Sequence, residues 1–239
     1  MKPRVIGILK TGSTRLVDAR RRRGGDYDAW FRQAFEPLGV RCVVVDAVAG
    51  ELPGEVDWDG LVITGSPASV HHREPWSEAA GHWVARRIAE ELPTLGVCYG
   101  HQLIAHALGG EAVPNPNGPE IGTYDVELLE ADPLFDGLDL ASFSAHLIHY
   151  DAVTRLPAGA RNLARSPLTE VQAFAVGEHV RCVQWHPEFD APGTREAVHQ
   201  DAEPLRRAGH DPDALAEGVR PLPYRERVLT NFVRYFLGS

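Results

Sequence analysis

The stretch TLGVCYGHQLIAHALGG, residues Thr94–Gly110, joins a short apolar segment to a helix-like pattern, with a cysteine between them. The first residues are small and apolar, which favours a buried strand. The apolar residues after the cysteine recur three and four positions apart, the spacing of one face of a helix. Gly109 and Gly110 then end the pattern, as glycine often does at the end of a helix. The stretch therefore predicts a strand that turns directly into a helix.

Cys98 lies at this junction, two residues from a glycine on either side. Gly96 and Gly100 allow a tight turn that lifts the cysteine side chain out of the sheet, which is the arrangement of a nucleophile elbow. The N-terminus of the following helix favours the thiolate form of the thiol. The alternative is a small buried cysteine at a helix start. The pattern favours Cys98 as a nucleophile.

A thiolate nucleophile needs a base, and the base needs a group that orients it. The stretch VRCVQWHPEFD, residues 180–190, supplies both, because His186 follows a predicted strand and Glu188 lies two residues on. On an extended backbone, which Pro187 favours, side chains two apart point to the same face. Glu188 can then accept a hydrogen bond from the His186 ring. The alternative is a strand-end histidine beside a solvated glutamate.

The rest of the chain predicts an α/β fold. Four short apolar runs read as strands and alternate with two helix-like stretches, which implies a mostly parallel sheet covered by helices on both faces. Beyond Gly118 strands and turns dominate and add an antiparallel β segment. The tail from Ala191 is helical, and Val228, Phe232 and Phe236 recur four positions apart, which predicts an apolar stripe that docks on the body of the protein. We expect residues 1–239 to form a single domain. The strand runs are Val5–Leu9, Val40–Asp46, Leu61–Thr64 and Pro93–Val97, and the helical stretches are Ala29–Leu38 and Glu78–Glu91.

Composition narrows the function classes. A net charge of −9 argues against a general nucleic-acid binder, which usually carries a basic face. Three cysteines give no disulfide framework and favour a reducing compartment. The N-terminal apolar run is too short for a signal segment or a membrane span, so we expect a cytoplasmic protein with no membrane partner. No metal-ligand spacing is present. Cys42 and Cys182 fall in strand-like runs and are predicted to be inert core thiols.

The motifs together resemble the class I glutamine amidotransferases, a family that uses a Cys-His-Glu triad on a flavodoxin-like α/β sheet. The resemblance implies that Cys98 is the nucleophile, His186 the base and Glu188 its orienting group. It also implies an oxyanion hole made by the backbone N–H groups of Gly65 and Tyr99. The matching stretches are Gly60–Val70, Gly96–Gly110, His149–Ala160 and Gln184–Phe189.

The resemblance further implies a chemistry without metal or cofactor. Cys98 attacks a γ-carboxamide, a γ-glutamyl thioester forms, and water releases glutamate. Gln102, Ser66, His149 and Tyr150 match positions beside the substrate, which would be glutamine or a γ-glutamyl compound. Ile148 stands where many synthetase-linked members carry serine, so the identity of the substrate is less fixed than the reaction.

Three functions remain open. The first is a stand-alone hydrolase of γ-glutamyl amide or peptide bonds, favoured because no acceptor domain is recognised in the chain. The second is a glutaminase subunit that delivers ammonia to a separate synthetase partner. The third is a catalytically silent binding domain, against which the complete triad argues.

Several other residues are candidates for a role at the substrate site or at a metal site. The basic run Ala19–Asp26 is either a solvated loop or a flap that attracts substrate carboxylates. Gly118 and Glu120 lie in a turn-rich loop that borders the substrate site in relatives. The histidine pair His71–His72 is predicted to be a surface feature rather than a metal site.

Overall fold

The computed structural model of the chain describes residues 3–14, 26–139 and 141–237. The basic run considered above lies outside these residues except for Asp26. The strands are β1 (Val5–Lys10), β2 (Arg41–Asp46), β3 (Gly60–Ile63), β4 (Thr94–Val97), β5 (Glu111–Pro114), β6 (Glu120–Leu128), β7 (Ser142–His149), β8 (Asp151–Arg155), β9 (Arg161–Arg165), β10 (Ala173–Val176) and β11 (Val180–Val183).

Helices connect and cover these strands. Three short 3-10 helices lie between them: η1 (Glu36–Leu38), η2 (Val70–His72) and η3 (Pro133–Phe135). The α-helices are α1 (Tyr27–Phe35), α2 (Pro75–Ala89), α3 (Tyr99–Ala107), α4 (Ala191–Gln200), α5 (Ala202–Arg207), α6 (Pro212–Gly218) and α7 (Arg227–Tyr235).

The main sheet has the strand order β2-β1-β3-β4-β11-β10-β9-β6-β7. The first five strands of this order pair in parallel, and the remaining pairs are antiparallel. The expected parallel sheet is therefore confirmed, and the expected antiparallel segment continues the same sheet. A separate two-stranded antiparallel sheet joins β5 to β8.

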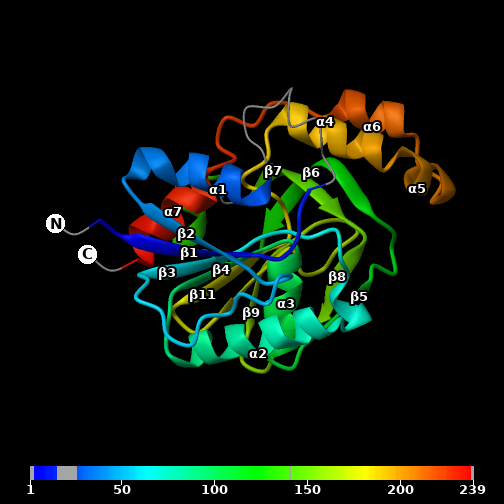
Figure 1. Ribbon diagram of the computed structural model, residues 1–239. Helices are drawn as coiled ribbons and strands as arrows, with labels where there is room; N and C mark the ends of the chain where they lie inside the picture. The colour runs from blue at the N-terminus through cyan, green and yellow to red at the C-terminus, as the bar shows by residue number, and fades with distance from the viewer. Residues whose placement is uncertain (1–2, 15–25, 140, 238–239) are drawn as a thin grey trace.

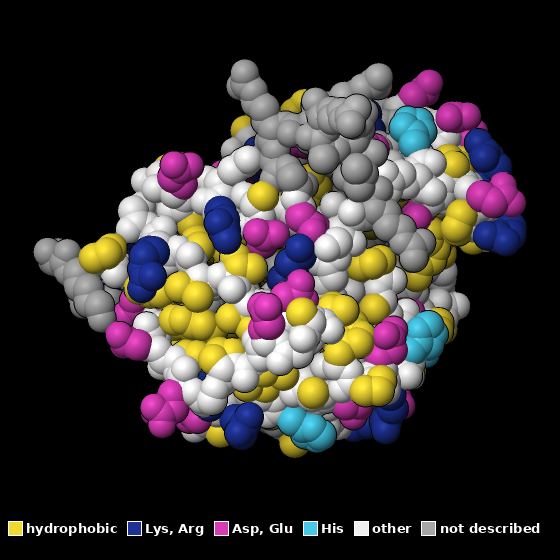
Figure 2. Space-filling view, in the orientation of Figure 1, with side chains coloured by type: hydrophobic (Ala, Val, Ile, Leu, Met, Phe, Trp, Pro, Cys, Tyr) yellow, Lys and Arg dark blue, Asp and Glu magenta, His cyan; other side chains and the backbone are white. Residues whose placement is uncertain are grey.

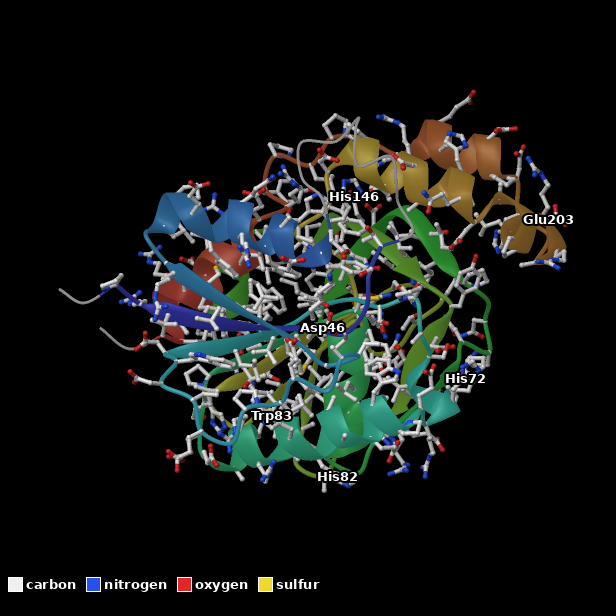
Figure 3. All side chains as sticks on the ribbon, in the orientation of Figure 1. Asp46, His72, His82, Trp83, His146 and Glu203 are labelled. Carbon is white, nitrogen blue, oxygen red and sulfur yellow. The ribbon has the colours of Figure 1, made fainter. Side chains whose placement is uncertain are left out.

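Helices cover both faces of the parallel half, as the alternation of strands and helices predicts. Figure 1 shows α1 and α7 on one face and α2 and α3 on the other. Helix α2 packs on the sheet through an apolar face. The fully buried Trp83 points toward the sheet, while the exposed His82 points away from it (Figure 3). Trp83 also donates its ring N–H to the Pro53 carbonyl at 2.6 Å. The buried strands between two helical layers place their carboxyl ends at one edge, where ligands bind in such sheets.

The C-terminal part of the chain is helical, as expected. Helices α4 and α6 pack on β6 and β7 and lie at the upper right of Figure 1. Helix α7 packs beside α1 and η3 and buries Val228 and Phe232, with Phe236 packed against the same core. The predicted apolar stripe on the tail is thus part of the main core.

The surface carries acidic and basic side chains intermixed over the face seen in Figure 2, with hydrophobic atoms between them. No helix within the described ranges is both long and apolar enough to cross a bilayer.

Replacing Phe232 with alanine tests the docking of α7. Phe232 is fully buried in the core that also holds Phe31 and Phe35. We expect Phe232→Ala to lower the free energy of unfolding by about 3–5 kcal/mol, because the variant loses apolar burial and leaves a cavity. Denaturant unfolding measures this value. Arg234→Ala is the control, since this side chain is 65% exposed on the same helix, and should change stability by about 0.5 kcal/mol or less. Equal effects of the two substitutions would contradict the docking of α7 into the core.

Candidate active site

Cys98 occupies a strained turn between β4 and α3. Its backbone has φ 51° and ψ −102°, a conformation that non-glycine residues rarely adopt. The flanking glycines explain how the turn closes. A Cβ on Gly96 would lie 2.7 Å from the Gly100 carbonyl oxygen, and a Cβ on Gly100 would lie 2.6 Å from the Ile63 carbonyl oxygen. The predicted elbow is therefore present, and both glycines are required for the helix to approach the sheet.

The remaining predicted groups lie at the same sheet edge. The parallel strands β3, β4 and β11 are neighbours, and each is followed directly or within three residues by a residue of the site. Cys98 follows β4, Gly65 follows β3 and His186 follows β11. The Cys98 N–H donates to the Val183 carbonyl at 2.9 Å, which ties the elbow to the strand that carries the histidine.

His186 and Glu188 form the expected hydrogen bond, with 2.7 Å between Nδ1 and Oε1, and both side chains are buried. Because a carboxylate can only accept, the imidazole donates through Nδ1, which leaves Nε2 to face Cys98. The expected extended backbone is wrong. Pro187 and Glu188 form a turn, in which the Phe189 N–H donates to the His186 carbonyl at 3.3 Å. The turn folds the Glu188 carboxylate back onto the ring that precedes it.

The environment of His186 favours the charged ring. Burial lowers the pKa of His186, but the negative charges of Glu188 and Cys98, together with hydrogen bonds to both, raise it to about 10. The ring is also held in place by stacking on Phe189, with 4.3 Å between the ring centroids. An imidazolium oriented in this way can hold a thiolate and deliver a proton to a group beside Cys98.

The turn after β3 has a fixed peptide orientation. The Gly65 carbonyl accepts from the Thr64 hydroxyl at 2.9 Å and lies 3.1 Å from the Thr11 hydroxyl, and both threonines are fully buried. The Thr64 carbonyl accepts from the Gly100 N–H at 3.2 Å. In a trans peptide the N–H points opposite to the carbonyl, so the Gly65 N–H is directed away from the start of α3, and the Ser66 N–H away from the two hydroxyls.

This orientation bears on the expected oxyanion hole. Gly65 itself touches the histidine, because a Cβ there would lie 2.8 Å from His186 Cε1. The orientation favours the Ser66 N–H, rather than that of Gly65, as the donor on this turn. The Tyr99 N–H belongs to the first turn of α3, where backbone donors have no partner within the helix.

A cavity of about 450 Å³ opens beside Cys98. All four residues expected beside the substrate line it, together with Cys98 and His186. These four are Ser66, Gln102, His149 and Tyr150. Gln102 is held by its amide nitrogen, which donates to the Asp151 carbonyl and to the Gln184 side chain, both at 3.1 Å. The Ile148 carbonyl lies 3.6 Å from the Cys98 sulfur.

A buried polar cluster lies behind His149. Glu120 is fully buried and accepts hydrogen bonds from the side chains of Ser166, Thr169 and Gln172. Its carboxylate also lies 3.3 Å from His149 Nε2. Burial raises the pKa of Glu120, but hydrogen bonds from His149 and Thr169 outweigh this and lower it. Glu120 thus supports the cavity wall through His149, while Gly118 is not among the residues that line the cavity.

Other residues of the cavity were not anticipated from the sequence. Two aromatic residues, Tyr27 at the start of α1 and Phe189, line the cavity. Ala197 and Gln200 of α4 and Asp201, which follows this helix, line it as well. The Asp26 carboxylate caps α1 by accepting from the Tyr27 N–H and pairs with Lys10 at 2.7 Å, which fixes Tyr27 beside the site. An aspartate before a helix is a recognisable capping signal. Because Asp26 lies far from the triad along the chain, its sequence position does not indicate that it fixes a residue of the cavity.

Three other histidines, His71, His101 and His106, contact neighbouring side chains. His71 lies 3.3 Å from the Asp151 carboxylate, and His106 bonds Glu78 at 2.9 Å. Burial lowers the pKa of His101 to about 3, so it is a neutral ring packed against Phe174. No cluster of three or more metal-ligating side chains occurs within residues 3–14, 26–139 and 141–237.

Comparisons with known proteins agree with this geometry. Residues 24–202 match the family model described as glutamine amidotransferase class-I. The chain is 38% identical over 167 residues to a glutamine-hydrolysing GMP synthase of Aeropyrum pernix, covering 69% of this chain and 31% of that protein. It is 36% identical over 168 residues to a glutamine-hydrolysing GMP synthase subunit of Sulfolobus acidocaldarius, covering 69% of this chain and 85% of that protein.

A third relative is named for a different activity. The chain is 29% identical over 174 residues to gamma-glutamyl peptidase 3 of Arabidopsis thaliana, covering 70% of each chain. The fold matches a crystal structure of a glutamine amidotransferase from Thermotoga maritima with a TM-score of 0.78, at 21% identity and with 98% of this chain and 99% of that chain covered. The chain spans about three tenths of the length of the first two GMP synthases that it matches.

Selective alkylation tests the special position of Cys98. Burial raises the pKa of both other cysteine thiols, Cys42 and the fully buried Cys182, so each has less thiolate at neutral pH. Cys98 lines the cavity beside a charged imidazole. We expect iodoacetamide at pH 7 to modify Cys98 at least about tenfold faster than either, since the thiolate is the reactive form. Peptide mapping by mass spectrometry follows the three sites. Equal labelling of the folded protein would contradict this expectation.

Replacing Glu188 with glutamine tests the cause of the His186 charge. The pKa of the wild-type ring is raised to about 10, above the unperturbed histidine value of about 6.5, so the folded ring keeps its proton through neutral pH and loses it only toward pH 10. In Glu188→Gln the carboxylate charge is gone, and we expect the ring to deprotonate at lower pH. Imidazole ¹⁵N NMR measures this titration, with the neutral His101 as an internal reference. An unchanged titration would mean that Glu188 does not control the ring.

Proposed function

The chain belongs to the class I glutamine amidotransferase family, and on this premise we propose that it hydrolyses γ-glutamyl amide or peptide bonds through a thioester on Cys98. The observation that carries the proposal is geometric: Cys98 and His186 line one cavity, and Glu188 accepts a hydrogen bond from His186 Nδ1. Since α1, the sheet and α4 all contribute to one cavity, we further propose that residues 1–239 act as one catalytic domain.

In the first step the Cys98 thiolate attacks the γ-carbonyl carbon of the substrate. The C–S bond forms, and the carbonyl oxygen takes up negative charge. The Ser66 and Tyr99 N–H groups are the donors for this oxyanion. Two preorganised donors suit such a charge, because they need no rearrangement as it develops.

The tetrahedral adduct then collapses. The C–N bond breaks, and the leaving nitrogen takes the proton from His186 Nε2, so the amine or ammonia departs neutral. Glu188 keeps Nδ1 protonated and the ring aligned throughout. A γ-glutamyl thioester on Cys98 remains.

Water completes the cycle. The neutral His186 removes a proton from water, whose oxygen attacks the thioester carbonyl, and the C–S bond breaks to release glutamate. Cys98 returns as a thiolate beside the protonated ring. Both steps use the same base and the same oxyanion donors, as expected for acyl transfer through a covalent intermediate.

The γ-glutamyl half of the substrate lies on the side of the cavity walled by Gln102 and His149. Both side chains are fixed by hydrogen bonds to the Asp151 carbonyl, at 3.1 Å from Gln102 Nε2 and 2.9 Å from His149 Nδ1. Tyr150 stands at the rim of the same wall, where it is 38% exposed. We propose that this wall holds the α-amino acid end of the substrate.

A second candidate is a glutaminase subunit that feeds a separate synthetase. The identity to the GMP synthase subunit of Sulfolobus acidocaldarius, 85% of which is covered, favours it. The first candidate has support from the clamped turn after β3, since its carbonyl is held by Thr11 and Thr64 of this chain itself. A partner is then not needed to set the orientation of the Ser66 N–H.

Turnover by the purified chain separates the two candidates. We expect steady multiple turnover of glutamine or of at least one γ-glutamyl peptide without nucleotide or partner, measured as release of ammonia, amine and glutamate. Cys98→Ala is the control and should be inactive. Acylation of Cys98 that stops after a single turnover with every substrate would favour the partner-dependent subunit. No acylation at all would likewise contradict the stand-alone hydrolase, but not the subunit, which would then require its synthetase partner to become active.

Replacing Thr11 with valine tests the clamped turn. The substitution removes one of two hydroxyls that hold the Gly65 carbonyl, so the Ser66 N–H loses part of its orientation. We expect kcat to fall roughly tenfold with little change in KM, a smaller effect than losing an oxyanion donor outright. Thr94→Val is the matched control. Its buried hydroxyl bonds the Leu92 carbonyl at the opposite end of β4, so kcat should be unchanged. Equal kcat values for the two variants would contradict a role for the clamp.

A further inference from the structure

We infer that the cavity contains an apolar subsite for the leaving group, and that the preferred substrates are γ-glutamyl conjugates of amines or amino acids with apolar side chains. The subsite is formed by Tyr27, Phe189 and Ala197. The inference rests on the proposed γ-glutamyl hydrolysis and adds which leaving amine the site selects.

The position of the leaving nitrogen follows from the triad. Nδ1 of His186 is occupied by Glu188, so only Nε2 can give the proton to the departing amine. The nitrogen must therefore come within about 2.6–3.2 Å of Nε2. Whatever is attached to that nitrogen then extends from the scissile bond along the side of the cavity next to the His186 ring.

That side of the cavity is aromatic and apolar. The His186 ring stacks on Phe189, and the Tyr27 ring lies nearly parallel to both, at centroid distances of 6.2 Å from His186 and 6.0 Å from Phe189. Ala197 of α4 packs in the same cluster. All three apolar residues also line the cavity, so their surfaces face the space that a substituent on the nitrogen would enter.

The wall is rigid. Trp30 supports it from α1, edge-on to Phe189 at 4.2 Å and to Tyr27 at 6.4 Å. Tyr27 is itself held at its backbone by the capping Asp26. A fixed apolar surface favours a ligand that covers it with carbon, and it loses little ordering entropy when the ligand binds.

Ammonia, the leaving group of glutamine, has no carbon with which to cover this wall. A γ-glutamyl amino acid does, and the cavity of about 450 Å³ falls within the range of sites that hold ligands of that size. Gln200, three residues from Ala197 on α4, also lines the cavity and supplies a polar group for the polar end of such a leaving group.

All substrates of this class share one thioester, so deacylation is the same for each of them. Differences in kcat/KM therefore report acylation, in which the leaving group is still attached. We propose to measure kcat/KM of the purified chain for glutamine, γ-glutamyl-glycine and γ-glutamyl-leucine. The last two differ only in an apolar side chain. We expect γ-glutamyl-leucine to exceed γ-glutamyl-glycine at least tenfold, since even one methylene is worth about tenfold or more in an apolar pocket.

Two substitutions in α4 test whether the apolar subsite causes the difference in kcat/KM between the leucine and glycine conjugates. Ala197→Leu fills the subsite and should lower the leucine-to-glycine ratio at least about fivefold. His199→Leu is the matched control, because His199 is an exposed residue of the same helix outside the cavity lining, and it should leave the ratio unchanged. Circular dichroism and the unfolding midpoint establish that each variant is folded.

The possible failures are distinct. Glutamine turnover that equals or exceeds that of γ-glutamyl-leucine, or a ratio that Ala197→Leu leaves unchanged, overturns the apolar subsite while γ-glutamyl hydrolysis stands. Absence of turnover with every γ-glutamyl compound, glutamine included, overturns the proposed function itself. If Ala197→Leu does not fold, the wild-type comparison of the leucine and glycine conjugates still decides the inference.

Discussion

The close approach of helix α3 to strands β3 and β4 is the constraint on which the site depends. Without side chains at Gly96 and Gly100, the two backbones come near enough to force Cys98 into its left-handed conformation. The same approach lets the Gly100 N–H reach the Thr64 carbonyl, and this bond sets the peptide of the neighbouring turn. Because β11 lies beside β4 in parallel register, His186 arrives at the same edge. One backbone contact thus fixes the positions of Cys98, of the turn after β3 and of His186.

The buried charges of the site are costly to the fold and useful to the reaction. Removing an imidazolium and a carboxylate from water is unfavourable, and their attraction compensates only when the geometry is good. Here the turn through Pro187 supplies that geometry, and stacking on Phe189 removes the freedom of the ring. Because both side chains are buried, each charge acts strongly on the other. The strain at Cys98 and the buried pair are features that a chain selected for stability alone would not need.

The sequence predicts the parts of the molecule whose signals are local. The four apolar strands, the elbow and the tail stripe each lie within one segment, so periodicity and glycine spacing suffice to find them. The contact between His186 and Glu188 was predicted, but through an extended backbone, whereas a turn forms it. The orientation of the Gly65–Ser66 peptide depends on hydroxyls from two separate strand ends, Thr11 and Thr64, and no local pattern reveals it. Tyr27 and Ala197 reach the cavity only because α1 and α4 meet over the sheet edge.

Different elements of the chain build the two halves of the cavity. Under the proposed function, one half carries the chemistry of the reaction and the other carries the selectivity for the leaving amine. The elbow, the turn after β3 and the wall at Gln102 and His149 belong to the sheet and its direct connections, and under the proposed function they bind the γ-glutamyl group that every substrate shares. The aromatic side is built by Tyr27 of α1, Ala197 of α4 and Phe189, and both Tyr27 and Phe189 stack on the His186 ring. Under the proposed function, changes in these residues would alter which amine is released while leaving Cys98 and Glu188 in place. Under the proposed function, chemistry and selectivity are thus open to separate substitution, because they rest on different elements around one scissile nitrogen.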